Sequence, residues 1–149
     1  MELRVEPIGE DQFEQLLPMI AAYQGFYEAE DVPTERNRRF FRRFIAPSDE
    51  GMLIGAWHAD ALLGYACLYW HHSSTRAADT VLMNDLYVDE AARGRGVGRA
   101  LIEATAGAAR DRGAHHVEWT TRPDNEAAQR LYDSTGAEKS TWIEYELGL

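Results

Sequence analysis

Hydrophobic and polar residues along the chain follow two periods, one typical of strands and one typical of helices. Residues 2–8 alternate as a half-buried strand does. Apolar residues between positions 13 and 23, and again between 34 and 45, recur at the spacing that covers one face of a helix. The pattern therefore predicts a strand followed by two helices.

The rest of the chain first repeats strand-forming runs and then alternates strands with helices. Runs rich in strand-forming residues cover 52–58, 61–71 and 80–88. The later periods predict a helix over 97–112, a strand over 115–121, a helix over 124–135 and a strand over 137–147. This order favours a mixed sheet in an α/β protein of the α+β type, and the length of 149 residues suits a single domain spanning 1–149.

Composition and charge narrow the classes of partner and compartment. The formal charge of −10 at pH 7 disfavours nucleic acid and favours cationic small molecules. No apolar run approaches the ~20 residues that cross a bilayer, so no membrane contact is expected. The single cysteine, Cys67, cannot form an internal disulfide, and the start of the chain lacks the pattern of a secretory signal. We therefore expect a cytoplasmic protein.

A glycine-rich loop joins the strand at 80–88 to the helix at 97–112. Glycines let successive N–H groups point into one concavity, and the helix adds its unpaired N-terminal N–H groups. The glycines and arginines of this loop and of the first helical turn are Arg93, Gly94, Arg95, Gly96, Gly98 and Arg99. The loop indicates a phosphate-rich ligand, and the alternative is a simple turn with solvated arginines. The spacings of a dinucleotide fingerprint and of a P-loop both fail here.

Two spacings match those of a known family. Arg93, Gly96 and Gly98 fill the pattern Arg/Gln-x-x-Gly-x-Gly/Ala. Downstream stands Asn125-Glu-Ala-Ala-Gln-Arg-Leu-Tyr132, followed by Gly-Ala at 136–137. Together the two motifs resemble the GNAT superfamily of acyl-CoA-dependent N-acyltransferases.

The resemblance implies both a fold and a co-substrate. The fold is a single GNAT-like domain with a mixed, mostly antiparallel sheet of about six to seven strands, splayed in its middle and flanked by about four helices. The glycine loop then holds the pyrophosphate of coenzyme A, and the pantetheine arm enters the gap between the strands at 80–88 and 115–121. Acetyl-CoA is the implied co-substrate. The implied coenzyme-binding residues are Leu86, Tyr87, Val88, Arg93, Gly94, Arg95, Gly96, Val97, Gly98, Arg99, Asn125 and Tyr132.

The candidate general base lies in residues 83–88, Met-Asn-Asp-Leu-Tyr-Val, which are similar to the Leu-Glu-Asp-Phe-Phe-Val pattern of spermidine/spermine acetyltransferases. The glutamate of that pattern, often assigned to general-base work there, corresponds here to Asn84. Asp85 is then the leading candidate by position, followed by Glu118 and Glu144. Neighbouring strand residues face opposite ways, so a bulge would decide whether Asn84 or Asp85 enters the cleft. The alternative for Asp85 is a local structural hydrogen bond.

The candidate general acid lies on the helix predicted over 124–135. Tyr132 follows Asn125 by about two helical turns, so both residues face one side of that helix. Tyr132 fits protonation of the departing thiolate, and a backbone N–H near Leu86 to Val88 fits stabilisation of the oxyanion. Tyr132 could instead be a core tyrosine, and Asn125 could be only a helix cap.

The joint between the first two predicted helices falls where the polyamine-type enzymes carry their substrate segment. Aromatic faces and carboxylates are the groups that bind a cationic amine. The candidate substrate-binding residues, besides Asp85, are Tyr23, Phe26, Tyr27, Glu28, Glu30 and Asp31. The alternative is a hydrophobic contact together with solvated acids.

The expected function is transfer of an acetyl group from acetyl-CoA to a primary amine of a small cationic substrate, by direct attack through a tetrahedral intermediate. The alternatives are a protein or peptide N-acetyltransferase and a non-catalytic acyl-CoA sensor. A nucleic-acid-binding module built on the five arginines of residues 36–43 is a more distant alternative, because the net charge disfavours it and these arginines suit a solvated helix face.

Two further expectations concern metals and assembly. His71 and His72 are adjacent on a strand and point to opposite faces, so they cannot hold one metal ion, and no metal is expected. The resemblance implies a homodimer. The final predicted strand supports it, because Trp142, Ile143 and Tyr145 add apolar surface that a small domain has little room to bury.

Overall fold

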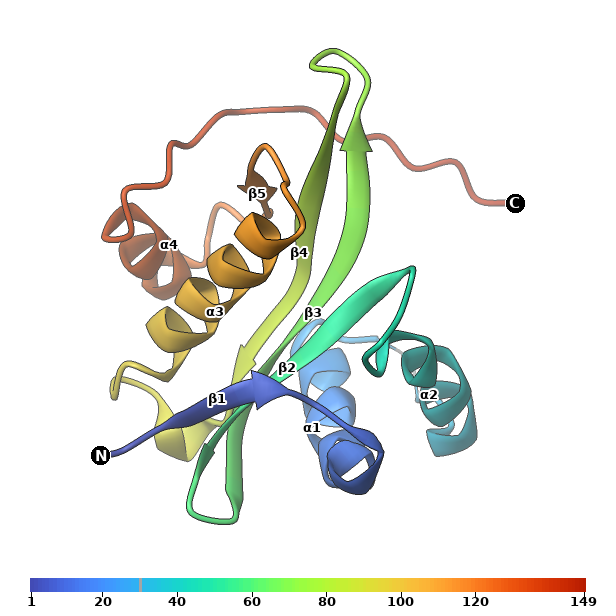
Figure 1. Ribbon diagram of the computed structural model, residues 1–149, viewed down its shortest axis with the longest axis vertical. Helices are drawn as coiled ribbons and strands as arrows, with labels where there is room; N and C mark the ends of the chain where they lie inside the picture. The colour runs from blue at the N-terminus through green and yellow to red at the C-terminus, as the bar shows by residue number, and fades with distance from the viewer. Residues whose placement is uncertain (30) are drawn as a thin grey trace.

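The computed structural model describes residues 1–29 and 31–149, and at its centre lies a five-stranded sheet with the order β1-β2-β3-β4-β5 (Figure 1). The strands are β1 (Arg4–Pro7), β2 (Gly51–His58), β3 (Ala61–Ser73), β4 (Ala78–Val88) and β5 (Val117–Glu118). The first four pair antiparallel in chain order, and β5 lies parallel to β4. The predicted mixed sheet of an α/β protein is therefore confirmed.

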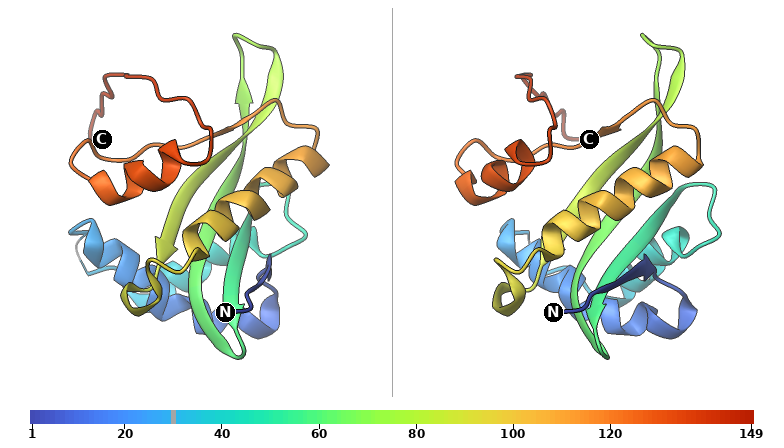
Figure 2. Two further views of the ribbon diagram at one scale, coloured as in Figure 1. Left: turned by 90° about the vertical axis from the view of Figure 1, so that its left-hand side faces the viewer. Right: turned by 60° about the vertical axis from the view of Figure 1, so that its left-hand side comes forward.

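Helices cover both faces of the sheet (Figure 2). The helices of the first face are α1 (Glu10–Phe26) and α2 (Thr34–Phe41), and those of the second are α3 (Val97–Asp111) and α4 (Glu126–Asp133). Two short 3-10 turns, η1 (Arg42–Phe44) and η2 (Glu90–Ala92), follow α2 and β4. The expectation of about four helices is confirmed. None of the helices in the described ranges is long and apolar enough to span a bilayer.

Two hydrophobic cores, one on each face of the sheet, hold the layers together. The central strands β2 and β3 supply both cores: Leu53 and Cys67 belong to the core under α1, and Ile54 and Leu68 to the core under α3. A strand that is buried on both faces cannot alternate apolar with polar residues, which explains the nearly continuous apolar runs at these positions. Burial also raises the pKa of the Cys67 thiol, which makes this side chain a small core residue.

Two predicted strands differ from the structure. The run at 115–121 forms only the two residues of β5, and residues 137–147 form no strand in the described part of the chain. The sheet therefore has five strands, and the expectation of about six to seven was wrong. A strand needs a neighbour that pairs with its backbone, and the C-terminal segment runs past the sheet without one (Figure 1).

The sheet opens between β4 and β5, as the resemblance implied. The two strands pair only at Val81–Val117 and Leu82–Glu118. Beyond this point, within residues 1–29 and 31–149, no strand lies beside the edge of β4 from Met83 to Val88 on the β5 side. This open edge lies directly before the glycine-rich loop, which places backbone groups of β4 next to that loop.

Candidate active site

A β-bulge in β4 determines which polar side chains reach the α1 face of the sheet. Asp85 lies opposite Cys67 and Met83 lies opposite Leu68, so Asn84 is the extra residue. Because the bulge interrupts strict alternation, the two polar side chains lie together, and the Asn84 amide donates a hydrogen bond to Asp85 Oδ1 at 2.9 Å. Asp85 is buried, whereas Asn84 is exposed.

Asp85 is a carboxylic acid that the fold keeps away from water. The residue is only 6% exposed, and burial raises the pKa of its carboxyl group to about 6, while hydrogen bonds from Asn84 and Tyr23 lower it in part. The group therefore exchanges its proton close to neutral pH, which is where a general base works best. The local hydrogen bond considered as an alternative is present, and it is compatible with such a role.

Tyrosine rings gather around Asp85. Tyr23 lies in the middle of the group, with its ring centroid 5.1 Å from Tyr27, 6.2 Å from Tyr65 and 5.8 Å from Tyr87. The Tyr65 hydroxyl is buried and has no hydrogen-bond partner among the described residues, and burial raises its pKa, with a further contribution from the charge of Asp85. The structure therefore brings the predicted Tyr23 and Tyr27 together with Asp85 in an aromatic and poorly hydrated site.

Sequence reasoning missed the two tyrosines that β3 contributes. Tyr65 and Tyr69 flank Cys67 at two-residue spacing, which places all three on one face of the strand. Tyr69 is linked to the site, because its hydroxyl accepts a hydrogen bond from the Asn84 amide at 3.2 Å. The signal was available in the two-residue period of β3, but it was obscured by the apolar residues on the other face.

The acidic residues predicted for the substrate do not all join this group. Glu28 and Asp31 are exposed beyond the end of α1, and Phe26 is also exposed. Glu30 lies outside the described residues. The sequence-predicted set thus divides into residues that surround Asp85 and residues at the rim.

The glycine loop presents backbone donors at the start of α3. Gly94 and Gly96 have left-handed φ angles of 76° and 84°, which only glycine adopts without strain. Gly96 is the N-cap of α3, no side chain caps this end, and the Ala100 N–H donates to the Gly96 carbonyl at 3.0 Å. The three preceding N–H groups, at positions 97–99, have no carbonyl one turn earlier in the helix and form an anion-binding end.

Gly98 has a different task from the other two glycines. A Cβ at this position would lie 2.9 Å from Leu131 Cδ2, so the missing side chain lets α3 and α4 approach closely. The neighbouring Val97 is buried, so its side chain belongs to the core under α3.

The three arginines of the loop differ in their contacts. Arg93 donates from Nε to the Val88 carbonyl at 3.0 Å, and its guanidinium lies 5.6 Å from the Tyr87 ring centroid. Arg99 donates to the hydroxyl and, at 3.3 Å, to the carbonyl of Ser134 at the end of α4. Arg95 is exposed and takes part in no ion pair of the described chain. Of the three, Arg95 therefore has its guanidinium most available to a phosphate.

The backbone of β4 offers donors to the gap. The Asp89 N–H donates to the Leu63 carbonyl at 2.8 Å on the β3 side, whereas the Val88 carbonyl accepts from Arg93 on the opposite side. Because successive residues of a strand direct their backbone groups to opposite edges, the N–H groups of Leu86 and Val88 face the open edge. This is the stretch in which an oxyanion donor was expected.

Asn125 lies at the start of α4, and Tyr132 lies in its last turn. Asn125 is the N-cap, because its Oδ1 accepts from the Ala128 N–H at 3.1 Å. The Tyr132 ring packs edge-on against Trp119, with a centroid distance of 5.4 Å. Burial, with a smaller contribution from Tyr27, raises the pKa of Tyr132 to about 12, so the hydroxyl keeps its proton at neutral pH.

The remaining candidate bases are engaged elsewhere. Glu118 faces His71 and His116, with N–O distances of 3.4 Å and 3.5 Å. Glu144 lies in the exposed C-terminal segment. Asp85 is therefore the one member of the predicted set that is both buried and among aromatic rings.

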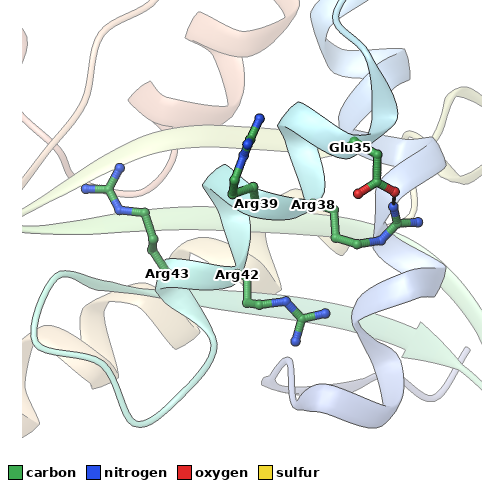
Figure 3. Close-up of a pocket in the computed structure, with 5 residues that line it drawn as sticks. All are labelled: Glu35, Arg38, Arg39, Arg42 and Arg43. Atoms are coloured by element: carbon green, nitrogen blue, oxygen red, sulfur yellow. Dashed lines mark hydrogen bonds and ion pairs between the residues drawn. The ribbon is translucent and has the colours of Figure 1, made fainter.

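Four of the five arginines of residues 36–43 line a separate hollow on α2 and η1 (Figure 3). Its lining residues are Glu35, Arg38, Arg39, Arg42 and Arg43. Three of these arginines pair with exposed glutamates: Arg38 with Glu14, Arg42 with Glu10 and Arg43 with Glu50. The hollow shares no residue with the site around Asp85, and its ion pairs are those of a solvated helix face.

The matching family and the sequence relatives are named as acetyltransferases. The family model described as the acetyltransferase (GNAT) family matches residues 16–137. The chain is 37% identical to the D-amino-acid N-acetyltransferase of Saccharomyces cerevisiae over 130 residues, which cover 86% of this chain and 78% of that protein. It is 39% identical to the L-2,4-diaminobutyric acid acetyltransferase of Streptomyces coelicolor over 70 residues, which cover 46% of this chain and 41% of that one.

A solved structure supports the same assignment. The crystal structure of a probable acetyltransferase matches with a TM-score of 0.85 and 28% sequence identity, over 98% of this chain and 97% of that chain. The fold, the free N–H groups at the start of α3 and the family match agree with one another. The chain therefore belongs to the acetyltransferase (GNAT) family and is an acetyl-CoA-dependent N-acetyltransferase.

Proposed function

We propose that residues 1–149 act as one domain that transfers the acetyl group of acetyl-CoA to a primary amine of a small cationic substrate. The observation that carries this proposal is the buried Asp85, whose pKa is raised to about 6 among tyrosine rings beside the open edge of β4. A carboxylate and aromatic faces attract an ammonium group, and the carboxylate can accept a proton from the nitrogen once this has attacked the thioester.

The coenzyme is bound by the glycine loop in this proposal. The N–H groups at positions 97–99 hold the pyrophosphate, and the exposed Arg95 adds a positive charge. The pantetheine arm follows the open edge of β4. The N–H groups of Leu86 and Val88 then lie where the thioester carbonyl develops negative charge.

The proton has to leave the amine during the reaction. An alkyl ammonium has a pKa near ~10.4, so only about one molecule in a few thousand is nucleophilic at pH 7. A carboxylate with a pKa of about 6 lies about four pKa units below this, which makes proton transfer before attack unfavourable by ~6 kcal/mol. The neutral fraction of the amine, whose first proton has gone to water, therefore attacks the thioester. The attacking nitrogen then becomes far more acidic, so Asp85 is best suited to accept its second proton, directly or through water, as the C–N bond forms.

The last step is the departure of coenzyme A as a thiolate. Collapse of the tetrahedral intermediate breaks the C–S bond and releases the thiolate of coenzyme A, which takes a proton or a hydrogen bond from the Tyr132 hydroxyl. The products are then the acetylated amine, free coenzyme A and a proton. Because the pKa of Tyr132 is high, its hydroxyl donates a hydrogen bond to the thiolate more readily than it transfers its proton.

A free-thiol release assay with acetyl-CoA tests the proposal against a panel of polyamines, amino acids, aminoglycosides and basic peptides. The proposal expects thiol release that depends on a small amine. Release with peptides alone would establish the protein or peptide alternative. Tight coenzyme binding with no release across the panel would establish the acyl-CoA sensor instead. The relatives named for D-amino acids and diaminobutyric acid favour a small acceptor.

We also propose that two copies of the chain associate and act in the cytoplasm. In the segment after α4, Trp142 is 86% exposed and Tyr145 is 89% exposed. Among the described strands β5 pairs with β4 alone, so the outer edge of the sheet is free beside this segment (Figure 2). The single cysteine is buried and unpaired, which suits a reducing compartment.

A further inference from the structure

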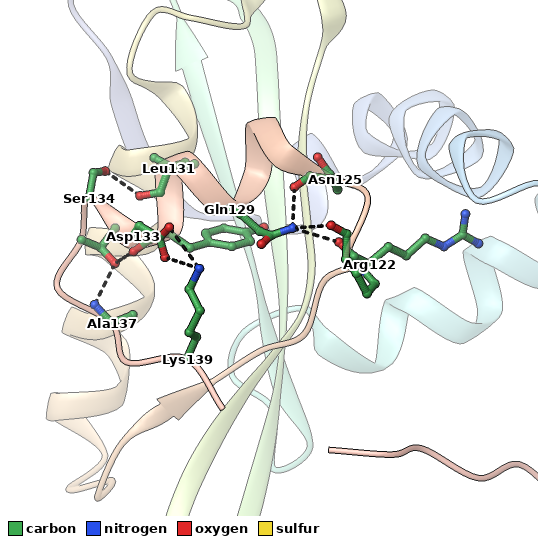
Figure 4. Close-up of polar contacts among 11 residues, drawn as sticks. Arg122, Asn125, Gln129, Leu131, Asp133, Ser134, Ala137 and Lys139 are labelled. Carbon is green, nitrogen blue, oxygen red and sulfur yellow. Dashed lines mark hydrogen bonds and ion pairs between the residues drawn. The ribbon is translucent and has the colours of Figure 1, made fainter. Parts of the chain in front are cut away.

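The loop between β5 and α4 holds an arginine, Arg122, whose side chain reaches the tyrosine rings around Asp85. The backbone of Arg122 is fixed, because its carbonyl accepts from the Asn125 N–H at 3.1 Å and from Gln129 Nε2 at 3.4 Å. Pro123 follows directly and restricts the backbone further. The side chain leaves this network and extends toward the first helices of the chain (Figure 4).

The guanidinium of Arg122 ends at the tyrosine cluster. It lies 5.0 Å from the Tyr27 ring centroid, and the Tyr27 ring lies 5.1 Å from Tyr23, which interacts with Asp85 and lowers the pKa of its carboxyl group. One row of aromatic rings thus separates a fixed cation from the buried carboxylate. A guanidinium that rests on an aromatic face is also oriented before a ligand arrives.

Arg122 differs from the other arginines near α1 in what it contacts. Arg38, Arg42 and Arg43 each pair with a glutamate. None of the ion pairs found within residues 1–29 and 31–149 includes Arg122. Its forked N–H groups therefore suit an external carboxylate, which they can bind by two parallel hydrogen bonds.

We propose that Arg122 binds the carboxylate of an amino-acid acceptor while Asp85 receives its amine, an inference that rests on the proposed function. A protein of net charge −10 repels carboxylates at long range, so a substrate that carries one needs a local cation beside the site. A diamino acid fulfils both conditions, because it is a net cation that also carries a carboxylate. The acceptor class is thus an amino acid rather than a simple polyamine.

Matched acceptors with and without the carboxylate test this inference. The pairs are lysine with cadaverine, and 2,4-diaminobutyrate with 1,3-diaminopropane. For the parent enzyme we expect kcat/KM to be at least tenfold higher for each amino acid than for its diamine. Arg122→Met retains an unbranched side chain over Tyr27 but removes the charge. It should raise KM for the amino acids about tenfold while leaving kcat, and kcat/KM for the diamines, within about twofold.

Arg76→Met is the matched control, because this exposed arginine lies in the turn between β3 and β4, away from the tyrosine cluster. It should leave the preference unchanged. Equal turnover of amino acids and diamines by the parent enzyme, or an equal loss for both in Arg122→Met, would overturn the carboxylate role and leave the acetyl transfer standing. Weaker coenzyme A binding by Arg122→Met in calorimetry would assign the arginine to the coenzyme instead. Absence of turnover with every amine would refute the proposed function itself.

Discussion

Asp85 shows at the residue scale how a group suited to catalysis reduces stability. Its pKa is about 6 in the folded protein and ~3.9 in an unfolded chain. The folded state therefore binds the proton more tightly, and the stability present below pH ~4 is lost as the pH rises through about 6. Two pKa units correspond to ~3 kcal/mol of unfolding free energy. In the proposed mechanism this loss of stability accompanies the use of the carboxylate as a base.

Asp85→Asn should separate these two roles. Without an ionisable group, the variant should unfold with a free energy up to ~3 kcal/mol higher than the parent at pH 7.5 and similar to the parent at pH 4, as measured by urea denaturation. Its kcat should fall by about 10²-fold or more. In the parent, kcat/KM should rise with pH through about 6, and Asp85→Asn should lack this limb. A variant that keeps parental activity would rule out Asp85 as the base.

Tyr132→Phe tests the leaving-group role, because it retains the ring that packs against Trp119 and deletes only the hydroxyl. A thiol with a pKa near ~8.5 leaves readily, so we expect the low end of general-acid assistance, about 10²-fold in kcat. The affinity for acetyl-CoA, measured by calorimetry, should change little. Turnover within threefold of the parent, with only ~1 kcal/mol of stability lost, would reduce Tyr132 to a packing residue.

At the scale of elements, features that depend on neighbouring residues could be predicted from the sequence, whereas the pairing of strands could not. The glycine loop was found because a strand end, left-handed glycines and a helix start depend on residues adjacent in sequence. The bulge at Asn84 depends on the register of β4 against β3, and the length of β5 depends on where it diverges from β4. These are contacts between distant segments, and a single sequence does not specify them.

Gly96 allows the anion-binding role of the loop to be tested apart from its backbone strain. A Cβ at this position meets no atom within 4 Å, but the φ of 84° strains any other residue. Gly96→Ala therefore controls for strain, and Gly96→Asp adds a negative charge beside the free N–H groups of α3. Coenzyme A binding should weaken at least tenfold further in Gly96→Asp than in Gly96→Ala, by calorimetry on folded variants. Equal affinity of the two variants would refute the pyrophosphate assignment.

At the scale of the whole molecule, the C-terminal segment explains why a well-patterned strand was predicted where the structure has none. Ile143 and Tyr145 are both exposed and alternate with Glu144, which is the pattern of a half-buried strand. The alternation is that of a strand, but no strand in the described residues pairs with this segment. Sequence periodicity reports that a face is to be buried, and it does not report which molecule buries it.

Association of two copies would supply that partner, and single substitutions on the two faces of the segment test it. Ile143→Lys places a charge on the apolar face, whereas Glu144→Lys, its neighbour on the opposite face of an extended strand, serves as the control. By light scattering we expect the parent and Glu144→Lys at about twice the monomer mass of 16.9 kDa, and Ile143→Lys at the monomer mass. An apolar strand face that is buried between copies accounts for this difference, since a buried lysine destabilises the interface. A parent protein at 16.9 kDa, with Trp142 fluorescence typical of a buried indole, would instead show that the segment folds onto its own sheet.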